Sequence, residues 1–382
     1  MKKKIKIIAD NKIPFLYGVL DPVANVIYLP GKEISRDHVR DADALIIRTR
    51  TKCNKDLLDG SRVRFIATAT IGFDHIDKEY CKLKNIVWQN APGCNSSSVE
   101  QYVLSALLII SAKKKFSLTG RTIGIVGIGH VGTKIARIAK LLGMKILLND
   151  PPRQRQEGSS EFVSLEKIQE ESDIITLHVP FTMTGQDKTY HLVNKKFLDS
   201  LSNRVNLINT SRGEVIDEKA LKESINLGRL GAVVLDVWEK EPLVERDFLE
   251  KVDLATPHIA GYSLDGKANG TRMSVRSVSR FFNLELDDWS VNSLPIPADN
   301  IINIDAAGRN TESIISEVVL KTYNVLDDDA NFRKSPDSFE KQCENYHPRR
   351  EFGSYTVQII NCLLYTSPSP RDRTRSRMPS SA

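Results

Sequence analysis

TIGIVGIGHVGTKIARIAKLLGMKILLND, residues 122–150, is the stretch of the chain that decides its fold. Its apolar beginning, Thr122–Val126, predicts a buried strand, and a glycine-rich turn then opens a helix predicted over Val131–Leu142. The turn carries three glycines in the pattern GxGxxG: Gly127, Gly129 and Gly132. Such glycines allow a tight turn and let backbone N–H groups approach a pyrophosphate at the helix N-terminus. The pattern alone is weak, but the strand before it and the helix after it predict a dinucleotide site.

An acidic residue at the end of the next predicted strand indicates which dinucleotide binds. The strand Lys145–Leu148 is followed by Asp150, 18 residues after Gly132, where a carboxylate can hydrogen-bond a ribose 2′-OH. A carboxylate there also repels a 2′-phosphate, so we expect NAD rather than NADP as the cofactor. Arg153 slightly weakens this expectation, because a nearby arginine can accommodate a 2′-phosphate. Taken alone, Asp150 could be an ordinary turn acid before Pro151.

Short apolar runs alternate with helical stretches through the first 260 residues. The other strand candidates are Lys4–Ala9, Ala44–Ile47, Phe65–Ala69, Asp173–Leu177, Val205–Asn209 and Ala232–Leu235. Each run is almost continuously apolar, as expected for parallel strands that are covered on both faces. The alternation of such strands with helices predicts doubly wound sheets.

We expect an α/β protein with two doubly wound parallel-sheet domains, one flavodoxin-like and one Rossmann, and a small α+β C-terminal domain. A helix that begins with the capping box Ser97-x-x-Glu100 should leave the first domain, and a helix over Asp265–Phe282 should return to it. The expected division is residues 1–93 with 258–288 as a discontinuous substrate-binding domain, 94–257 as an NAD-binding domain, 289–362 as the C-terminal domain and 363–382 as a tail.

The composition is that of a soluble globular protein, with 382 residues of which 41% are hydrophobic and 27% charged. Half of the net charge of +6 comes from residues 363–382, which hold four arginines and one aspartate. The rest of the chain has no basic stripe with interleaved aromatic residues, so we expect no nucleic-acid partner. The apolar run Val99–Ile110 is shorter than the ~20 residues of a membrane span, so we expect no membrane association.

Cysteine spacing and the N-terminal sequence favour a cytoplasmic location. The five cysteines form no CxxC pair and no cluster at zinc spacing with histidine, so we expect free thiols and no metal site. Scattered thiols are typical of a reducing cytosol. The basic start MKKKIKIIAD precedes an apolar run, Ile5–Ala9, that is too short for a signal peptide.

The end of the chain differs in composition from the rest. LLYTSPSPRDRTRSRMPSSA, residues 363–382, is rich in Ser, Pro and Arg and has no periodicity with which to pack. We interpret it as translated adapter sequence fused to a truncated reading frame, so that the domain over 289–362 would be truncated. A genuine disordered tail is the alternative.

Three polar residues could form a catalytic group. Arg212 follows a predicted strand in the NTSRG turn, where a guanidinium can grip a carboxylate with two hydrogen bonds. Glu241 lies in DVWEKEP and His258 in TPHIAG. A histidine is the usual base for a hydroxyl proton near neutral pH, and a carboxylate on its other nitrogen stabilises the imidazolium. Taken alone, Arg212 could be a surface residue and His258 a structural one, and sequence does not show that Glu241 reaches His258.

These motifs together resemble a known enzyme family. GIGHVG, the TSRG turn, DVWEKEP and TPHIAG, in this order and spacing, are similar to the D-isomer-specific 2-hydroxyacid dehydrogenases over roughly residues 4–290. The chain resembles in particular the members that carry a C-terminal dimerisation domain. The stretches that carry this second resemblance include DADALIIRTRT, FIATATIGFDHID, APGCNSSSVEQYV and NYHPRREF.

The resemblance implies an activity and a set of site residues. The activity is NAD-dependent oxidation, at C2, of a phosphorylated four-carbon sugar acid used in pyridoxal 5′-phosphate (vitamin B6) biosynthesis, by a homodimer. Arg212 and Glu241 would lie in the active site, and His258 would accept the proton. The residues implied to contact the cofactor are His130, Val131, Val179, Asp236 and Gly261, and those implied to contact the substrate are Thr49, Thr70 and Tyr262. Thr49 stands where some members have serine, and both supply a hydroxyl.

Arginines near the substrate residues could bind the phosphate. Arg48 and Arg50 flank Thr49 after the strand Ala44–Ile47, and we expect Arg48 to help bind the phosphate. A second basic pair, Arg349-Arg350, could reach in from a partner subunit. The alternative is that both residues of this pair are solvated surface charges.

Three other functions stay open on sequence grounds. The chain could act on phosphoglycerate or on a simple 2-hydroxy acid. It could be an NAD-binding co-regulator built on the same fold, since an intact Arg/Glu/His set does not exclude that role. It could also be a folded but inactive product of a truncated frame. A panel of substrates offered to the purified protein separates these functions.

Overall fold

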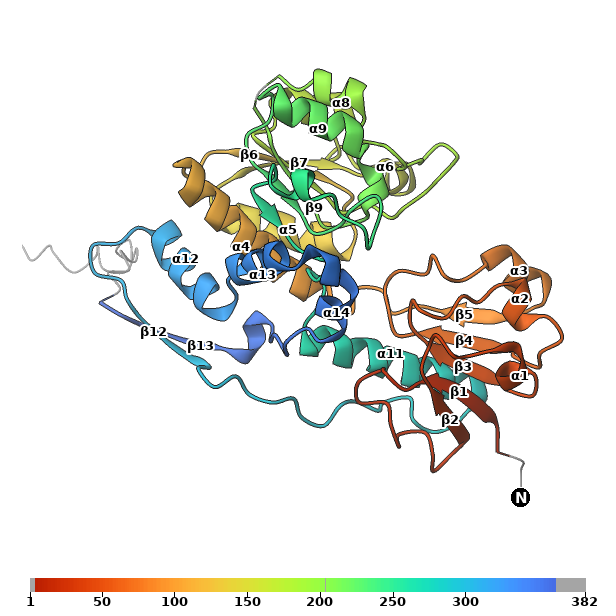
Figure 1. The fold of residues 1–382 in the computed structure, drawn as a ribbon. Helices are drawn as coiled ribbons and strands as arrows, with labels where there is room; N and C mark the ends of the chain where they lie inside the picture. The colour runs from red at the N-terminus through yellow and green to blue at the C-terminus, as the bar shows by residue number, and fades with distance from the viewer. Residues whose placement is uncertain (1–3, 203, 362–382) are drawn as a thin grey trace, which may run out of the picture.

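The computed structural model describes residues 4–202 and 204–361. Figure 1 shows two lobes, each built around a sheet, with the C-terminal helices packed beside the second lobe and reaching between the two. The expected tail over residues 363–382 lies outside the described residues.

The first sheet has five parallel strands in the order β2-β1-β3-β4-β5, which is the flavodoxin-like order that we expected. Its strands are β1 (Lys6–Asp10), β2 (Asn25–Leu29), β3 (Ala44–Ile47), β4 (Phe65–Thr68) and β5 (Val87–Gln89). One face is covered by α1 (Arg36–Val39), α2 (Lys55–Leu58) and α3 (Lys78–Leu83), and the other by α11 (Leu264–Phe282). Because both faces are covered, β3 and β4 are buried along their whole length.

The second sheet has six parallel strands in the order β11-β10-β9-β8-β6-β7. They are β6 (Thr122–Val126), β7 (Lys145–Asn149), β8 (Ile174–Leu177), β9 (Asn206–Asn209), β10 (Val233–Leu235) and β11 (Leu254–Ala255). A parallel bridge from Leu148 to Phe162 extends the sheet beyond β7. With this bridge as a minimal third strand, the order is that of a Rossmann sheet with one strand added. Every strand predicted from sequence is present, with ends within two residues of the prediction.

Helices cover both faces of the second sheet. One face carries α4 (Ser96–Lys114) and α5 (His130–Leu141). The other carries α7 (Leu165–Glu171), α8 (Lys195–Asp199), α9 (Glu218–Asn226) and α10 (Arg246–Leu249). The short α6 (Pro151–Glu157) follows β7 and buries none of its residues.

The C-terminal segment forms the small α+β unit that we expected. Its elements are β12 (Ile301–Asp305), α12 (Thr311–Thr322), α13 (Val325–Lys334), α14 (Phe339–Glu344) and β13 (Thr356–Ile360), with 3-10 turns at Pro336–Ser338 and Phe352–Ser354. One further 3-10 turn, Gly213–Val215, lies in the second lobe. β12 and β13 pair in parallel as a separate two-stranded sheet. α14 reaches the first lobe, where Glu340 forms ion pairs with Arg50 and with Lys32, the latter at 3.8 Å. The unit therefore contacts both lobes (Figure 1).

α4 is the buried helix predicted over Val99–Ile110, but its start differs from the prediction. The expected capping box is wrong, because the N-cap residue is Asn95 and Ser97 and Glu100 both lie inside the helix. Their side chains instead contact Lys134 of α5, at 2.8 Å from Ser97 Oγ and 3.8 Å from Glu100 Oε2. Among the described residues, no helix combines the length and apolar character that crossing a bilayer requires.

Cysteines and metal-ligating groups are dispersed in the described part of the chain. Cys53, Cys81, Cys94 and Cys343 are free thiols. Burial raises the pKa of the Cys94 thiol to about 12, which keeps it protonated and unreactive. Within residues 4–202 and 204–361, no group of three His, Cys, Asp or Glu side chains is arranged to hold a metal ion.

Candidate active site

Loops at the carboxyl ends of the strands bring the predicted site residues together. These residues are Arg48 after β3, Thr70 after β4, Arg212 after β9, Glu241 after β10 and His258 after β11. Ligands of doubly wound proteins bind at this edge, where the strand order reverses. In the first sheet the reversal lies between β1 and β3, and there Arg48 Nε donates a hydrogen bond to Asp10 Oδ2 at 3.1 Å.

His258 and Glu241 form a hydrogen-bonded pair. His258 Nδ1 lies 2.8 Å from Glu241 Oε2, and the other carboxylate oxygen accepts from the backbone N–H of Trp238 at 2.9 Å. A carboxylate at Nδ1 holds the proton there and leaves Nε2 as the basic nitrogen of the neutral ring. Nε2 has no hydrogen-bond partner among the described residues. The pair therefore has the arrangement of a general base and its orienting carboxylate.

The charges around His258 favour its protonated form. Desolvation is the largest single influence and lowers the pKa of His258, but the Glu241 and Asp236 carboxylates together raise it above its ordinary value, in the direction expected for Glu241. The positive charge of Arg212 lowers the pKa. Arg212 thus lies near enough for its charge to act on the His258 ring.

The buried carboxylate of Asp236 holds the loop that carries His258. Asp236 is 1% exposed, and it accepts hydrogen bonds from the backbone N–H groups of Ile259 at 2.8 Å and Ala260 at 2.9 Å. It also accepts from Thr256 Oγ1 at 2.6 Å, and its backbone carbonyl accepts from the N–H of His258 at 2.7 Å. Four hydrogen bonds to one residue therefore fix the path of this loop.

A glycine allows the loops after β9 and β10 to meet. A Cβ at Gly213 would lie only 2.0 Å from the carbonyl carbon and oxygen of Trp238, so no other residue permits this approach. The contact places the loop of Arg212 against the segment that holds Glu241. Arg212 Nη1 donates to Ser211 O at 2.8 Å, and its Nη2 and Nε lie 3.2 and 3.4 Å from Asp74 Oδ2. The Arg212–Asp74 ion pair joins the second lobe to the first.

The glycine turn has space for a dinucleotide. Gly127 has a φ of 91°, and a Cβ there would lie 2.6 Å from the backbone oxygen of His178. A Cβ at Gly132 would lie 2.1 Å from Gly127 O, so α5 packs against the turn only because glycine is present. Gly129 is the N-cap of α5, and nothing lies within 4 Å of the position of its missing Cβ. This open space before the free N–H groups of a helix fits a pyrophosphate.

Asp150 lies beside this turn. Its Oδ2 accepts from the backbone N–H of Ile128 at 2.8 Å, and its Oδ1 accepts from that of Arg153 at 3.1 Å. The Arg153 guanidinium pairs with Glu157 at 2.7 and 3.0 Å and donates to Ile128 O at 2.5 Å. The arginine that weakened the expectation of NAD is therefore already engaged, and the negative charge of Asp150 disfavours a 2′-phosphate.

The other predicted cofactor residues surround the same turn. His130 and Val131 are the first residues of α5, and Val179 follows β8. The His130 ring packs against Gly93 of the first lobe, where a Cβ would lie 2.5 Å from the ring. A Cγ atom of Val179 lies 2.9 Å from the position of a Cβ on Gly127.

The two passages of the chain between the lobes contact each other. The chain enters the second lobe near Asn95 and leaves it over residues 258–263. A Cβ at Gly261 would lie 2.1 Å from Asn95 Nδ2, and one at Gly266 would lie 2.9 Å from Asn95 Cβ. The predicted cofactor residue Gly261 thus lies at this junction.

The predicted substrate residues lie on the first lobe and on the returning passage. Thr70 Oγ1 donates to Gly72 O at 2.9 Å and lies 2.7 Å from Thr68 Oγ1. Thr49 is exposed, next to Arg48. Tyr262 is half-buried, and burial raises the pKa of its hydroxyl, while the nearby charge of Arg48 lowers it. Tyr262 and Arg48 therefore share one environment.

Sequence reasoning missed Lys267. This residue lies in the first turn of α11, and its Nζ lies 5.1 Å from the ring centre of Tyr262. Burial lowers the pKa of Lys267, and the positive charges of Arg48 and Arg349 lower it further. The charges of Arg48, which is paired with Asp10, and of Arg349 both act on Lys267, and such a gathering of positive charge favours a bound anion. No motif distinguishes Lys267 in the sequence from a solvated helix lysine.

Arg349 and Arg350 are not solvated surface charges, so that alternative is wrong. Arg349 is 3% exposed, and Arg350 contacts the two carboxylate oxygens of Asp265 at 2.8 and 3.0 Å. The segment that carries them packs against α4 and the start of α11. Because Arg349 is buried within its own subunit and Arg350 is paired with Asp265, we assign neither to the substrate phosphate.

Known proteins share both the sequence and the fold. Residues 109–260 match the family described as "D-isomer specific 2-hydroxyacid dehydrogenase, NAD binding domain", and residues 295–366 match a "Domain of unknown function (DUF3410)". Among solved structures, one is D-lactate dehydrogenase from Aquifex aeolicus, complexed with NAD and lactic acid, which is 26% identical in sequence with a TM-score of 0.63. The match covers 74% of this chain and 96% of the D-lactate dehydrogenase chain. The NAD+-bound 3-phosphoglycerate dehydrogenase of Entamoeba histolytica is also 26% identical, with a TM-score of 0.62 and coverages of 76% and 100%.

Curated relatives narrow the family. The chain is 51% identical over 354 residues to the erythronate-4-phosphate dehydrogenase of Bacteroides thetaiotaomicron, covering 92% of this chain and 99% of that protein. It is 40% identical over 356 residues to the enzyme of the same name from Shigella flexneri, with coverages of 92% and 94%. The chain therefore belongs to the erythronate-4-phosphate dehydrogenases, within the D-isomer specific 2-hydroxyacid dehydrogenase family.

Proposed function

We propose that the protein oxidises 4-phospho-D-erythronate to (R)-3-hydroxy-2-oxo-4-phosphobutanoate with NAD, in pyridoxal 5′-phosphate (vitamin B6) biosynthesis. The observation that carries this proposal is the 2.8 Å His258–Glu241 pair beside Arg212, in a chain 51% identical to a named erythronate-4-phosphate dehydrogenase. The open space at Gly129 and the position of Asp150 support NAD as the cofactor.

His258 is the proposed general base. Neutral His258 takes the proton of the C2 hydroxyl on Nε2, and Glu241 stabilises the imidazolium that forms. NAD, when bound, supplies the oxidised nicotinamide ring that accepts the hydride from C2. Asp236 keeps the histidine loop in place through its bonds to Ile259 and Ala260. Such fixed positioning avoids reorganisation during the reaction.

Arg212 is the proposed ligand of the substrate carboxylate. Its guanidinium is held from one side by Ser211 O, and its other nitrogens contact Asp74, which is 55% exposed in its side chain. An arriving carboxylate can replace Asp74 and form two parallel hydrogen bonds. Bound there, Arg212 also polarises the carbonyl that develops at C2, a contribution that is large in a site closed to water.

Arg48 and Lys267 are the proposed ligands of the 4-phosphate. Arg48 is fixed by Asp10, Lys267 Nζ lies 5.1 Å from the ring centre of Tyr262, and the charge of Arg48 acts on both Tyr262 and Lys267. A phosphate brings about two negative charges. The two cations can balance these charges, and the Tyr262 hydroxyl can donate a further hydrogen bond to a phosphate oxygen. This arrangement would favour a phosphorylated acid over lactate or other simple 2-hydroxy acids.

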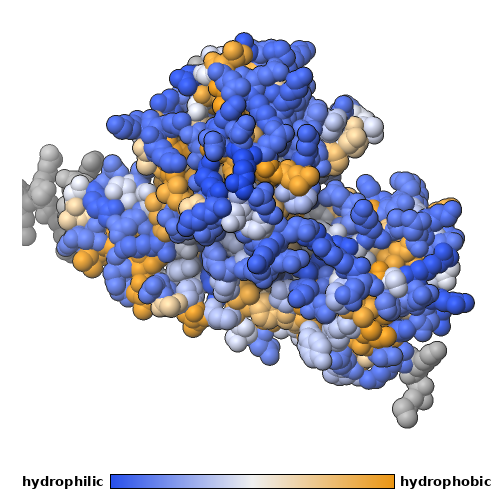
Figure 2. Space-filling view, in the orientation of Figure 1, coloured by the Kyte–Doolittle hydropathy of each residue, from blue (hydrophilic) through white to orange (hydrophobic). Residues whose placement is uncertain are grey.

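The C-terminal unit is the proposed dimerisation domain, in a cytoplasmic homodimer. Ile302 and Ile304 of β12 are buried, whereas Ile301, Val357, Ile359 and Ile360 are each at least 39% exposed. Figure 2 shows hydrophobic surface over this region at the lower left. A two-stranded sheet is marginal alone, so a second copy would cover the exposed face. We assign dimerisation to residues 289–362, substrate binding to 1–93 with 258–288, and NAD binding to 94–257.

A substrate panel tests the proposed function. The purified protein is offered NAD with 4-phospho-D-erythronate, 3-phosphoglycerate, D-lactate and unphosphorylated D-erythronate, and NADH formation is followed, with coupled reduction of 2-oxo acids as the reverse assay. We expect the highest kcat/KM for 4-phospho-D-erythronate. A higher value for 3-phosphoglycerate or D-lactate would replace the proposed substrate, and turnover of none would remove the proposal.

A further inference from the structure

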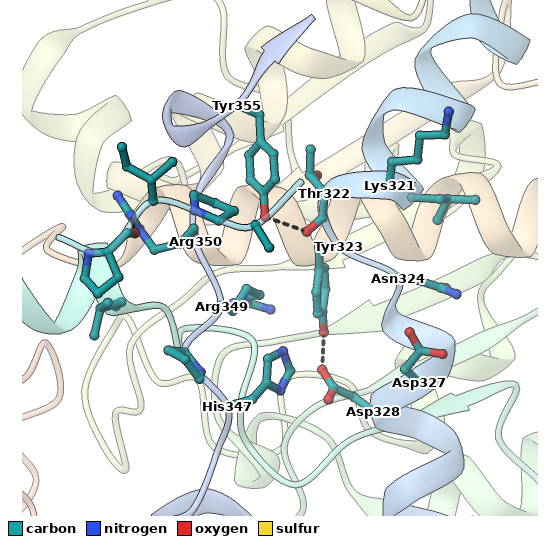
Figure 3. A pocket seen from close by; sticks show the side chains of 17 residues that line it. Lys321, Thr322, Tyr323, Asn324, Asp327, Asp328, His347, Arg349, Arg350 and Tyr355 are labelled. Atoms are coloured by element: carbon teal, nitrogen blue, oxygen red, sulfur yellow. Dashed lines mark hydrogen bonds between the residues drawn. The ribbon is translucent and has the colours of Figure 1, made fainter. Parts of the chain in front are cut away.

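Arg349 is a buried cation of the C-terminal unit, in the domain of unknown function. It lies between α14 and the 3-10 turn at Phe352–Ser354, and only 3% of its surface is exposed. Its guanidinium carbon lies 4.2 Å from the ring centre of Tyr323 and 5.9 Å from that of Tyr346. Figure 3 shows Arg349 beside Tyr323, on the wall of a cavity of about 500 Å³.

A negative charge lies behind the two tyrosines. The hydroxyls of Tyr323 and Tyr346 both donate to Asp328 Oδ2, at 2.7 and 2.6 Å. The hydroxyls are thus polarised toward the Asp328 carboxylate, while the Tyr323 ring lies beside the Arg349 guanidinium. Such a stack fixes an arginine through cation–π attraction and leaves its hydrogen-bond donors for other partners.

Arg349 contacts the loop that carries His258 and also contacts α4. Arg349 Nη2 donates to the backbone oxygen of Ala260 at 2.5 Å and to that of Ser98 at 3.4 Å. Its own backbone oxygen accepts from the N–H of Leu264 at 2.8 Å. Arg349 therefore contacts the loop at two points, Ala260 and Leu264, and between these points lie Gly261, Tyr262 and Ser263.

Ala260 is held from two sides by opposite charges. Its N–H donates to the buried Asp236 at 2.9 Å, and its carbonyl accepts from the buried Arg349. Asp236 anchors the side of the loop that carries His258, and Arg349 anchors the side that carries Tyr262. The two residues come from different domains, so the second lobe and the C-terminal unit both hold this loop.

The residues next to Arg349 fasten the same segment. Glu351 Oε1 accepts from the hydroxyls of Ser98 at 2.7 Å and Ser263 at 2.9 Å, and Ser263 is the N-cap of α11. Arg350 forms its two-point contact with Asp265 in the first turn of that helix. Three consecutive side chains thus follow the chain from Ala260 into α11.

Burying this arginine is costly. Its Nε and Nη1 are buried without a hydrogen-bond partner among the described residues, and buried unpaired donors destabilise a fold. A methionine or leucine would fill the space between the tyrosines at lower cost. Arg349 destabilises the packing around it but binds the loop that carries His258, and we infer that its role is to hold that loop in position.

We propose that Arg349 is a positioning residue for the oxidation reaction, through which the C-terminal domain holds the His258–Tyr262 loop in its reactive geometry. This inference rests on the proposed function only for its kinetic test. It gives the domain of unknown function a second role beside dimerisation, because loss of the Arg349 contact would alter catalysis within each subunit.

The decisive variant is Arg349→Met, which keeps side-chain length and the contact with the rings but removes the donor. We expect kcat per active site, counted by titration with NADH, to fall about tenfold or more, since misplacing a catalytic group by ~1 Å can cost 100-fold. The acid limb of the kcat/KM profile should also move to lower pH, because a loosened loop weakens the His258–Glu241 bond that raises the pKa of His258. Arg349→Lys should restore part of kcat.

A matched control separates positioning from general damage to the domain. Arg246→Gln removes the exposed Arg246–Asp337 ion pair between the second lobe and the C-terminal unit, and it should change neither kcat nor the pH profile. If a substitution only causes part of the protein to unfold, fewer sites bind NADH in the titration, but kcat per site and the pH profile stay unchanged. That result for Arg349→Met would overturn the proposal.

Hydrogen exchange tests the contact without any substrate. The amides of Ala260 and Leu264 should exchange faster in Arg349→Met than in the unmodified protein, while amides of β3 in the first lobe should not change. Equal exchange at Ala260 and Leu264 would overturn the proposal even if the enzyme is active. If the substrate panel fails but exchange rises as expected, the proposed function falls and the loop contact stands.

Discussion

Gly213→Ala is the change that most directly tests how the catalytic group is assembled. The added Cβ would lie 2.0 Å from the carbonyl carbon and oxygen of Trp238 and 2.4 Å from the backbone nitrogen of Glu239. All three atoms are backbone, so no side chain can move aside. To reach an ordinary contact of about 3.4 Å, the loops after β9 and β10 must separate by more than about 1 Å.

That separation moves Arg212 away from Glu241 and His258. Overpacking of this kind costs about 1–3 kcal/mol of folding free energy, and a misplacement of ~1 Å costs about 100-fold in rate. We therefore expect a folded protein that binds NADH, with kcat about 100-fold lower. Circular dichroism, NADH fluorescence titration and steady-state rates measure these three quantities.

Gly353→Ala is the matched control, because a Cβ at Gly353 meets nothing within 4 Å and its φ is not positive. Its kcat should equal that of the unmodified protein. A Gly213→Ala variant with unchanged kcat would show that the close approach of the two loops is not needed for catalysis, and would refute the reasoning.

Four further predictions concern single side chains. His258→Ala should lower kcat by about 100-fold or more with NADH affinity preserved; retention of more than a tenth of kcat would remove His258 as the base. Because His258 must be neutral to accept the proton, kcat/KM for oxidation should rise as the pH rises through the raised pKa of His258. Glu241→Gln removes the charge that raises this pKa, so the rise in kcat/KM should occur at lower pH in that variant. A rise at the same pH in both proteins would contradict the pairing of Glu241 with His258. Asp150→Ala should weaken NAD binding and relax discrimination against NADP, measured as the ratio of the Kd values for the two cofactors. Equal Kd values of the unmodified protein for NAD and NADP would argue against this role of Asp150. Lys267→Met should raise KM for the phosphorylated substrate far more than for unphosphorylated D-erythronate, and an equal effect on both would exclude a phosphate contact.

The strands were predictable because parallel strands buried on two faces carry uniform apolar runs. β3 and β6 have the predicted ends, and both lie inside sheets covered by helices. The strands that were missed lack this signal. β2 and β5 are edge strands with partly exposed side chains, and β13 is exposed at every position. These strands include polar side chains, which face solvent, so their sequences are not uniformly apolar as in a buried strand.

The catalytic group was predictable as a set of residues but not as a geometry. Arg212 and Glu241 follow predicted strands, which pointed to one edge of a sheet, whereas the two-residue strand before His258, β11, was not predicted. The sequence could not show that Trp238 N–H holds one oxygen of Glu241, nor that Lys267 lies over Tyr262. Each depends on contacts between segments that are distant in the chain, which local patterns do not encode.

The capping prediction failed for a related reason. Ser97 and Glu100 have the spacing of a capping box, and in an isolated helix they would satisfy each other's N–H groups. In the folded protein both side chains contact Lys134 of α5, and the helix begins earlier, after Asn95. A tertiary contact therefore replaced a local one.

The contact of Asn95 with Gly261 and Gly266 decides how the two lobes can move. Because both passages of the chain meet there, an opening motion between the lobes has its axis near that point, and displacement grows with distance from it. His258 lies three residues before Gly261, and His130 of the glycine turn packs against Gly93, two residues before Asn95, so both lie near this junction. We therefore expect any opening of the lobes to displace His258 little, because the residue lies beside the junction about which they would turn.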